Sequence, residues 1–425
     1  MWYFLTFIFF AVLCIGVPLS FGMGIFSLSY IYLKGDLFFI TIPQKIYAGI
    51  DSFLLLAIPL FLLAGSLMNR GGITMRLIEL ARCLVGHIPG ALGHVTIVSN
   101  TIMAGMSGSA AADAVATGKI LIPAMIKDGY SRGFAAAICA SAATMAPMIP
   151  PSIGLVILGS LGNVSIGQLF LAGIIPGLLM SAYMMGACYL IAKRRGYSSG
   201  TRWVGVGTTA RAFLRACPAL LMPVLVVGSM VGGIVTPTEG AAVAALYALL
   251  LGFAQRELRL SELDGILSDV VSMTAVIYLL IGVFNVLTWI LAIERIPQLV
   301  TQYFIQLTDN VYVLLLVLNV LLLLLGTVME PVPMMILLGP TLYKVTAAFG
   351  IDPVHFSIVF MLNILIGVVS PPIGLNMFIA VTIARCTAIE FSIEVLPFMA
   401  ALVALLLLIT YVPAITLVLP EMLMR

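Results

Sequence analysis

The sequence predicts an all-α integral membrane protein built from two inverted-topology repeats, with re-entrant helical hairpins and unwound transmembrane helices. Three observations predict this fold class. The composition is too apolar for a chain surrounded by water, one ordered series of motifs occurs twice, and small residues or prolines interrupt the apolar stretches at matching places.

Composition places most of the chain in a lipid bilayer. Of 425 residues, 62% are hydrophobic and only 9% are charged, whereas a soluble domain has about 25% charged residues. Since a helix that crosses a bilayer needs about 20 apolar residues, we expect about ten to twelve membrane-embedded helices. The net charge of +3 comes from residues in short loops and gives no indication of nucleic-acid binding.

Two stretches indicate the topology. The first apolar run extends from Met1 to Leu33 with no preceding Lys or Arg, so we expect a retained first helix and not a secretion signal. Between Lys193 and Arg215, basic residues occur without a single acidic one. The positive-inside rule therefore predicts that the inter-repeat loop, residues 196–212, is cytoplasmic.

The two sides of this loop repeat the same motifs in the same order. Asp113 corresponds to Glu330 (330 − 113 = 217), and the proline pair that begins at Pro150 corresponds to the pair that begins at Pro371 (371 − 150 = 221). A duplicated membrane protein with broken helices is the signature of secondary transporters, whose sites lie between the repeats. The sequence therefore predicts a transporter with inverted repeats.

Each repeat is expected to hold scaffold helices, an amphipathic arm helix at the membrane surface, a hairpin and a broken helix. A proline, Pro18 or Pro237, interrupts the first apolar run of each half. The first repeat, residues 1–195, has the arm at 68–85, the hairpin at 88–126 and the broken helix at 133–163. The second, residues 213–425, has these elements at 287–304, 311–349 and 355–388.

The four helix breaks are the candidate binding sites. In hydrocarbon, unwound backbone persists only where it lines a cavity or meets a ligand, and freed carbonyls with nearby hydroxyls suit Na⁺. Half-helices that begin after the breaks would offer N–H groups to an anionic substrate. The candidate cation-binding residues are Ser107, Gly108, Ser109, Thr144, Pro150 and Ser152 in the first repeat, and Gly326, Thr327, Ser370, Pro371 and Asn376 in the second.

Two acidic residues follow the hairpin tips. Asp113 and Glu330 lie in apolar surroundings, where an ionisable group is a functional candidate, so we expect them to contact the substrate or to tune the nearby cation site. A simpler reading of the breaks stays open, since small residues permit close helix packing and prolines kink membrane helices. The occurrence of both break types twice, in one order, favours the ion site.

Several separated segments resemble the large membrane (M) subunit of tripartite ATP-independent periplasmic (TRAP) transporters. The resemblance covers nearly the whole chain and is carried by residues 105–154 (GMSGSAAADAVATGKILIPAMIKDGYSRGFAAAICASAATMAPMIPPSIG), 236–250 (TPTEGAAVAALYALL), 350–356 (GIDPVHF) and 370–376 (SPPIGLN). It implies sodium-coupled secondary active import of a small organic anion, a carboxylate or acidic sugar, by an elevator motion of a transport domain against a scaffold.

The resemblance also implies partners and a location. A periplasmic substrate-binding protein would deliver the anion, a small four-helix membrane subunit would complete the complex, and the chain would be a multi-pass protein of the bacterial inner membrane. Because no four-helix extension precedes Met1 and no binding-protein domain follows Arg425, both partners are expected to be separate chains. Na⁺ would be the coupling ion, and no other cofactor or metal is expected.

Three alternatives remain at this point. A stand-alone ion-coupled anion transporter of similar architecture would need no binding protein. An intramembrane serine protease is suggested by the GxSG string at Gly105–Gly108, but it would need a histidine within reach of Ser107. A passive channel fits poorly with paired hairpins and a duplicated cation site. We therefore expect no enzyme and no catalytic residues.

Overall fold

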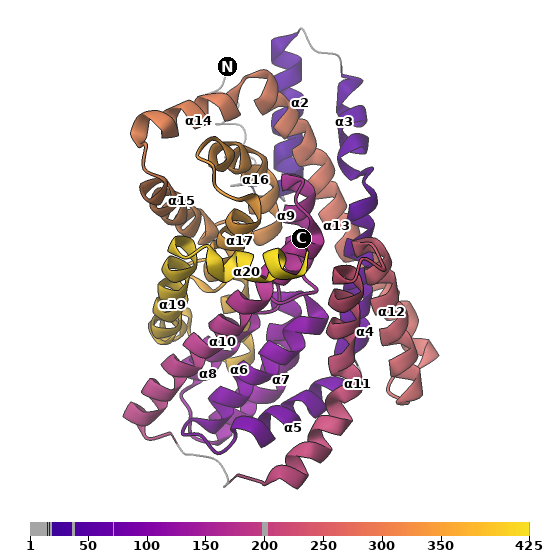
Figure 1. Cartoon of the computed structure of the whole chain (residues 1–425), viewed down its shortest axis with the longest axis vertical. Coiled ribbons are helices and arrows are strands. Elements are labelled where there is room, and N and C mark those ends of the chain that lie inside the picture. Colours follow the sequence, from indigo (N-terminus) through magenta and orange to yellow (C-terminus); the bar gives the residue numbers. More distant parts are fainter. Residues whose placement is uncertain are drawn as a thin grey trace.

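The computed structural model describes residues 15, 17, 19–35, 39–70, 72–197 and 203–424, and these form helices and loops without an extended strand (Figure 1). The expected first helix and its break at Pro18 lie outside the described residues. The elements are α2 (Leu19–Lys34), α3 (Thr41–Ile50), η1 (Phe53–Leu56), α4 (Ala57–Arg70), α5 (Ile73–Val85), α6 (Ala91–Ser107), α7 (Ala110–Lys127), α8 (Arg132–Ala143), α9 (Ile153–Gly162), α10 (Ile166–Arg195), α11 (Val206–Val231), α12 (Pro237–Ala254), α13 (Leu260–Ile293), α14 (Ile296–Leu307), α15 (Val311–Gly326), α16 (Pro331–Ala348), α17 (Pro353–Val369), α18 (Leu375–Ala384), α19 (Ala388–Tyr411) and α20 (Ala414–Leu423).

Five helices in the described part of the chain are long and apolar enough to cross a membrane: α10, α11, α12, α13 and α19. A sixth candidate is the pair formed by α3 and the η1–α4 segment, which is bent by 56°. Most other apolar helices have 10–17 residues. They are short because each arises where a break divides an apolar run, so they are embedded without crossing alone.

One group of helices packs around α13 and α12. α4 lies along α12, and α3 lies along α13. The second contact is close because glycines permit it: a Cβ added at Gly49 would lie 2.7 Å from Asn285 Cβ, and one at Gly282 would lie 2.9 Å from Ile46 Cγ2. This group, which we call the scaffold, faces the hairpins and broken helices.

Two arm helices lie at opposite ends of the molecule, α5 near the lower end and α14 across the upper end of Figure 1. Their boundaries correct the predicted ranges. The second arm starts at Ile296 and not at 287, because α13 continues to Ile293; the first starts at Ile73, because α4 continues to Arg70. Polar residues recur at helical spacing across the junctions that precede both arms, so this pattern does not reveal where each arm begins. Pro297, in the first turn of α14, does indicate the start of the second arm.

Charged contacts tie both joints to scaffold helices. Glu294, between α13 and α14, pairs with Lys34 at the end of α2 and accepts a hydrogen bond from Tyr30. At the other joint, Arg76 of α5 pairs with Glu257, which follows α12, and donates to Gln255. Each arm is therefore fixed at its N-terminal end, while its C-terminal end leads into a hairpin.

The broken helices interleave the two halves of the chain. α9 packs on α16 and α17 of the second half, and α18 packs on α7 and α8 of the first half. Phe134 of α8 and Phe356 of α17 occupy corresponding positions in the two sequence repeats, and both are fully buried. The hairpins and broken helices of both halves consequently share one core.

A buried polar network joins α15, α17, α19 and α20. Asn319 Nδ2 donates to Thr410 Oγ1 at 2.9 Å, and Asn363 Nδ2 donates to Asn319 Oδ1 at 2.8 Å. His355 lies beside it, with Nδ1 2.9 Å from Thr416 Oγ1 and Nε2 3.3 Å from the Thr410 carbonyl oxygen. Such hydrogen bonds between membrane helices each contribute about 0.6–2 kcal/mol, so the network fixes the relative positions of four helices.

Replacing Asn319 with alanine should therefore lower stability by about 1–3 kcal/mol, because it removes two interhelical bonds. Thermal unfolding of the purified protein in detergent would measure the loss. Val320→Ala is the matched control, because the neighbouring Val320 is 50% exposed and should change stability by less than about 0.5–1 kcal/mol. Equal effects of both substitutions would contradict the role of the network.

Candidate functional site

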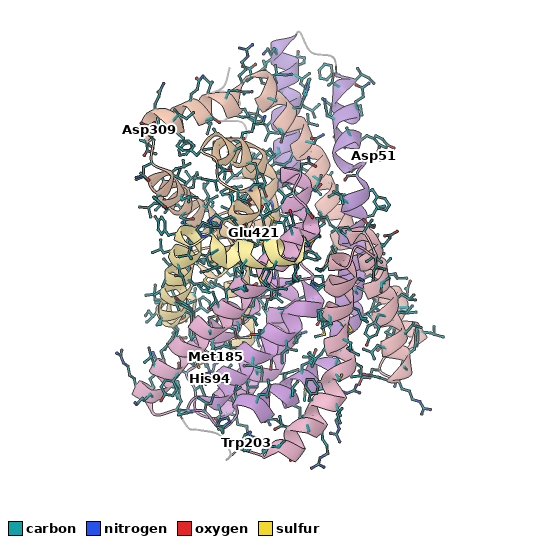
Figure 2. The ribbon with its side chains drawn as sticks, viewed as in Figure 1. Asp51, His94, Met185, Trp203, Asp309 and Glu421 are labelled. Carbon is teal, nitrogen blue, oxygen red and sulfur yellow. The ribbon has the colours of Figure 1, made fainter. Side chains whose placement is uncertain are left out.

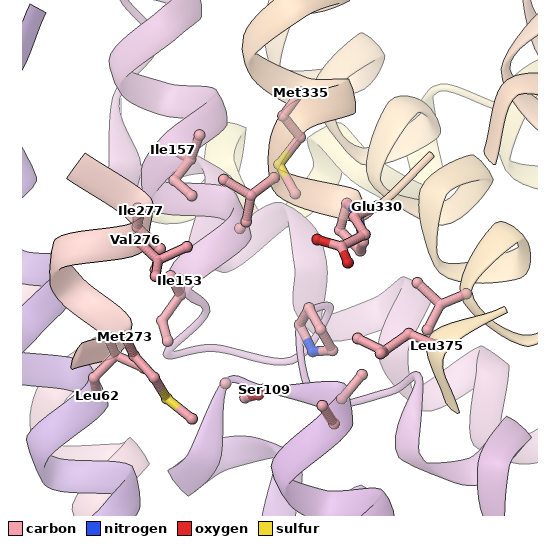
Figure 3. Close-up of a pocket in the computed structure, with 18 of the residues that line it drawn as sticks. Leu62, Ser109, Ile153, Ile157, Met273, Val276, Ile277, Glu330, Met335 and Leu375 are labelled. Atoms are coloured by element: carbon pink, nitrogen blue, oxygen red, sulfur yellow. The ribbon is translucent and has the colours of Figure 1, made fainter. Parts of the chain in front are cut away.

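The four helix breaks surround one central cavity of about 480 Å³ (Figure 3). Its wall contains the tips of both hairpins, the start of α9 and α18, and the middle of α13. A cavity of this size suits a small organic molecule. The breaks span residues 108–109, 144–152, 327–330 and 370–374, which confirms non-helical backbone at all four predicted places, although Ser107, Gly326, Val369, Leu375 and Asn376 belong to the flanking helices.

Four helix N-termini open into this cavity. The first residues of α7 (Ala110, Ala111) and α9 (Ile153, Gly154) line it, and so do the first residues of α16 and α18, namely Pro331, Val332, Leu375 and Asn376. The first N–H groups of a helix have no partner within the helix, and the helix dipole is positive there. In the first turn of α16 only Val332 offers such a group, because Pro331 and Pro333 have no N–H. The cavity wall therefore favours a negatively charged group.

The first hairpin tip is held tightly against the first unwound segment. Gly108 has φ +60°, and a Cβ there would lie 2.9 Å from the Pro151 carbonyl oxygen. Ser109 begins α7 by accepting a hydrogen bond from the Ala112 N–H at 3.4 Å, and its own N–H donates to Ser107 Oγ. Only a glycine fits at the tip, because both the left-handed backbone and the close contact exclude a side chain.

The unwound segment at 144–152 satisfies part of its own polar groups. Thr144 Oγ1 donates to the Ser141 carbonyl at 2.7 Å. Ser152 Oγ donates to the Pro147 carbonyl and accepts from the Leu155 N–H at 3.2 Å, which makes it the N-cap of α9. The Pro150–Pro151 and Pro371–Pro372 bonds are both cis. Neither Thr144 nor Ser152 lines the central cavity.

The second hairpin tip encloses an additional small cavity. About 220 Å³ in volume, it lies between residues 326–331 and the 367–375 loop region, and Glu330 lines both this cavity and the central one. α15 and α17 touch here through backbone, since a Cβ at Gly367 would lie 2.5 Å from the Gly326 carbonyl oxygen. In the first repeat, the hairpin tip instead contacts the unwound segment directly, at Gly108 and Pro151.

Two buried polar groups at the breaks have no partner within the described chain. Asp113 is fully buried, and neither of its carboxylate oxygens accepts a hydrogen bond of normal geometry, although the Ser107 hydroxyl is close. Asn376 donates to the Ala140 carbonyl at 3.2 Å, but its Oδ1 has no donor. An isolated buried carboxylate is so costly that Asp113 requires either a cation or a proton.

The predicted residues thus divide into two groups. Gly108, Ser109, Glu330 and Asn376 line the central cavity, and Gly326 lines the small one. The remaining residues lie beside the cavities: Ser107, Asp113, Thr144, Pro150, Ser152, Thr327, Ser370 and Pro371. The hydroxyls of Thr327 and Ser370 donate to the Leu324 and Ile366 carbonyls, at 2.8 and 2.7 Å.

Sequence reasoning missed the contribution of α13. Ser272, Met273, Val276, Ile277 and Leu280 form one face of this helix and close the cavity on the scaffold side (Figure 3). An apolar run with helical spacing reads as an ordinary membrane span. The polar residues within that run, such as Ser272, are the only signal that could have indicated a cavity.

Comparisons with known proteins agree with this architecture. The family model described as "Tripartite ATP-independent periplasmic transporter, DctM component" matches residues 6–415. The chain is 41% identical to the sialic acid TRAP transporter large permease protein SiaM of Vibrio cholerae, over 96% of this chain and 95% of that protein. It is 33% identical to the C4-dicarboxylate TRAP transporter large permease protein DctM of Rhodobacter capsulatus, over 97% of each chain.

Two further comparisons concern a longer relative and the fold. The isethionate TRAP transporter permease protein DctMQ of Oleidesulfovibrio alaskensis is 39% identical over 95% of this chain and 64% of its own length. The crystal structure of the Alcanivorax borkumensis YdaH transporter superimposes with a TM-score of 0.65, covering 88% of each chain at 15% identity. This last likeness concerns the fold alone.

Gly108→Ala tests the tight hairpin tip against a matched glycine. Gly350 also has a left-handed backbone, with φ +70°, but a Cβ there would meet nothing within 4 Å. Gly350→Ala should therefore cost only the backbone strain, about 1–2 kcal/mol, whereas Gly108→Ala should cost clearly more. Thermal unfolding of both variants measures the difference, and equal losses would contradict the contact with Pro151.

Proposed function

The chain belongs to the DctM family, the large membrane subunits of TRAP transporters, and from this premise we propose that it imports a small organic anion by sodium-coupled secondary transport. Family membership makes it a multi-pass protein of the bacterial inner membrane that takes part in secondary transport of organic acids. Sialic acid, isethionate and C4-dicarboxylates, named for the relatives, are the candidate substrates.

The convergence of four helix N-termini on one cavity carries the proposal. None of the cavity-lining side chains is basic, and Glu330 is acidic. An anion must therefore be held mainly by backbone N–H groups and helix dipoles. A bound cation would offset the charge of Glu330, which couples anion binding to cation binding through simple electrostatic attraction.

Two places suit Na⁺. In the first repeat, the unpartnered Asp113 carboxylate lies near the Ser107–Ser109 tip. In the second, Glu330 and the backbone around Gly326 surround the small cavity. Oxygen ligands and a carboxylate suit a hard cation, so we propose that both tips bind Na⁺.

The arrangement of arms and scaffold supports alternating access by an elevator motion. The arms lie at opposite ends of the molecule, and each joins a scaffold helix to a hairpin (Figure 1). We propose that the hairpins and broken helices move as one body against α13, with the repeats in inverted orientation. A periplasmic binding protein would deliver the anion, and a small four-helix membrane subunit would complete the complex.

Among the described residues, the protease alternative lacks a histidine placed to act as the base for Ser107. His94 lies on the same helix as Ser107 but 13 residues earlier, which is about 20 Å along the helix axis. Both ring nitrogens of His355 contact other groups, namely Thr416 of α20 and the carbonyl of Thr410 in α19. The relatives are transport permeases. A stand-alone transporter stays the second candidate, and it differs in needing no binding protein.

Uptake by the reconstituted complex should require an inward Na⁺ gradient, because Na⁺ at the hairpin tips would supply the positive charge that the side chains lining the central cavity lack. Proteoliposomes that contain the chain and its proposed partners would be supplied with each candidate substrate in radioactive form. Replacing external Na⁺ with K⁺ or choline should abolish uptake. Normal uptake in choline would contradict sodium coupling, and uptake without a binding protein would favour the stand-alone transporter.

Asp113→Asn should raise the half-saturating Na⁺ concentration by about tenfold or more, because it removes a charged ligand; tenfold corresponds to about 1.4 kcal/mol. Asp128→Asn is the matched control, since Asp128 is exposed at the other end of α7. The Na⁺ dependence of initial uptake would be compared for the two variants. An unchanged half-saturating concentration in a folded Asp113→Asn protein would mean that this carboxyl carries a proton and no cation.

A further inference from the structure

A further cavity, distinct from the central one and from the small one, is not used by the site described above. It has a volume of about 360 Å³ and lies between α3, η1, α9, α13 and α16. We call it the outer chamber. Its polar wall consists of Ser52, Ser160, Asn285 and Thr288. Hydroxyl and amide groups from three separate elements therefore face one space between the scaffold and the helices of the hairpins and breaks.

The outer chamber and the central cavity are consecutive parts of one path. α9 lines the central cavity with Ile153, Gly154 and Ile157, and it lines the outer chamber with Ile157, Ser160 and Leu161. These positions follow each other at helical spacing on one face. Ile157 belongs to both walls, so its side chain lies at the waist between the two spaces.

Two more helices pass along the same path. On α13, Leu280 lines the central cavity and Ile281 the outer chamber. On α16, Met335 lines the central cavity and Ile336 lines the outer chamber. The waist is thus made only of aliphatic and thioether side chains, whereas a polar chamber follows it. An apolar constriction of this kind excludes water and hydrated anions until the wall moves.

The outer chamber lies on the periplasmic side of the waist. Trp203, in the inter-repeat loop, lies at the lower end of the molecule (Figure 2), and the basic residues of that loop assign this end to the cytoplasm. α13 rises from its start toward α14 at the upper end (Figure 1). Residues 281–288 therefore lie farther from the cytoplasm than residues 272–280.

The polar groups of the outer chamber are available to a ligand. The hydroxyls of Ser52, Ser160 and Thr288 form no hydrogen bond with any residue that the structure describes. Many other membrane-helix hydroxyls in the chain donate to the carbonyl four residues earlier, as Thr117 does at 2.7 Å. Free hydroxyls at this depth need water or a ligand, because unsatisfied polar groups are costly there.

A basic residue precedes the part of α3 that lines the outer chamber. Lys45 lies one turn before Gly49 on α3, and its backbone carbonyl accepts a hydrogen bond from Asn285 Nδ2 at 2.7 Å. Its ammonium lies 5.6 Å from the ring centre of Trp289, the neighbour of Thr288. Lys45 has no acidic partner among the described residues, and Asp51 lies on the outer side of α3 (Figure 2).

We propose that the outer chamber is a second binding site, which takes a small hydroxylated organic anion on the periplasmic side of the Ile157 waist. Ser52, Ser160 and Thr288 would bind its hydroxyl or carboxylate oxygens, and Lys45 would attract its charge. The proposal rests on the proposed import function for the direction of travel only. The anion occupies the outer chamber before the waist opens and the central cavity receives it.

Cysteine labelling tests the site and its charge preference. Ser160→Cys is introduced after the six native cysteines have been replaced, and the membrane complex is treated with an anionic or a cationic methanethiosulfonate reagent. After correction for reactivity with free cysteine, the anionic reagent should react about fivefold faster, because Lys45 lies on the same helix as the α3 wall of the outer chamber and has no acidic partner among the described residues. Lys45→Gln should remove this preference. A faster reaction with the cationic reagent would overturn the proposal.

Sidedness is measured with the same reagents on spheroplasts and on inside-out vesicles. Asp309→Cys, at the upper end in Figure 2, and Trp203→Cys, at the lower end, report access from the two sides. Ser160→Cys should react from the periplasmic side. Reaction from the cytoplasmic side alone, or from neither side, would overturn the proposal. Ser52→Cys, on the opposite wall, replaces Ser160→Cys if that protein does not fold.

Occupancy is measured by protection. N-acetylneuraminate, isethionate and succinate are added in turn, and at least one should slow labelling of Ser160→Cys about threefold or more once it exceeds twice its Kd. If none slows labelling, the outer chamber is not an anion site. Protection by an anion that the complex does not take up would support the outer chamber and contradict the proposed import, so the two failures are distinguishable.

Discussion

The need to satisfy backbone groups at interrupted helices determines the architecture of this protein. Each break leaves N–H groups at the start of a helix, deep among apolar side chains, and four such starts meet at one cavity. Small residues allow these helix ends to approach closely. Gly108 packs against the Pro151 carbonyl, and Gly367 packs against the Gly326 carbonyl. The cavity follows from this requirement, since dipoles of one sign gather where no basic side chain is present.

The two halves solve the same problem differently. In the first, the hairpin tip closes on the unwound segment, and Asp113 is buried with no partner. In the second, a space remains beside the tip, and Glu330 reaches two cavities. Symmetry of the sequence motifs therefore does not extend to the electrostatics of the two tips. The buried carboxyl of Asp113 needs a cation or a proton for stability, while the exposed Glu330 carboxylate is free to respond to whatever enters the cavity.

The helix breaks could be predicted because glycine and proline act locally, through backbone conformation and the loss of an N–H donor. Ser109 and Ser152 were predicted as cation ligands, and their role as the N-caps of α7 and α9 emerges only from the structure. The cavity face of α13 could not be predicted, because its residues resemble those of any lipid-facing helix until the packing is known. The start of the second arm was misplaced for a related reason: polar spacing continues from α13 through the joint at Arg295.

The interleaving of α9 and α18 bears on how the chain is assembled. Ribosomal synthesis delivers α7 and α8 long before α18, yet α18 covers them: Gly118 of α7 faces Ile383, and Asn376 donates to the Ala140 carbonyl. Until roughly the last eighth of the chain has emerged, that small-residue surface has only lipid or an insertion chaperone to cover it. The first half therefore cannot reach its final packing until α18 has been made. A chain truncated before residue 375 would leave α7 and α8 uncovered.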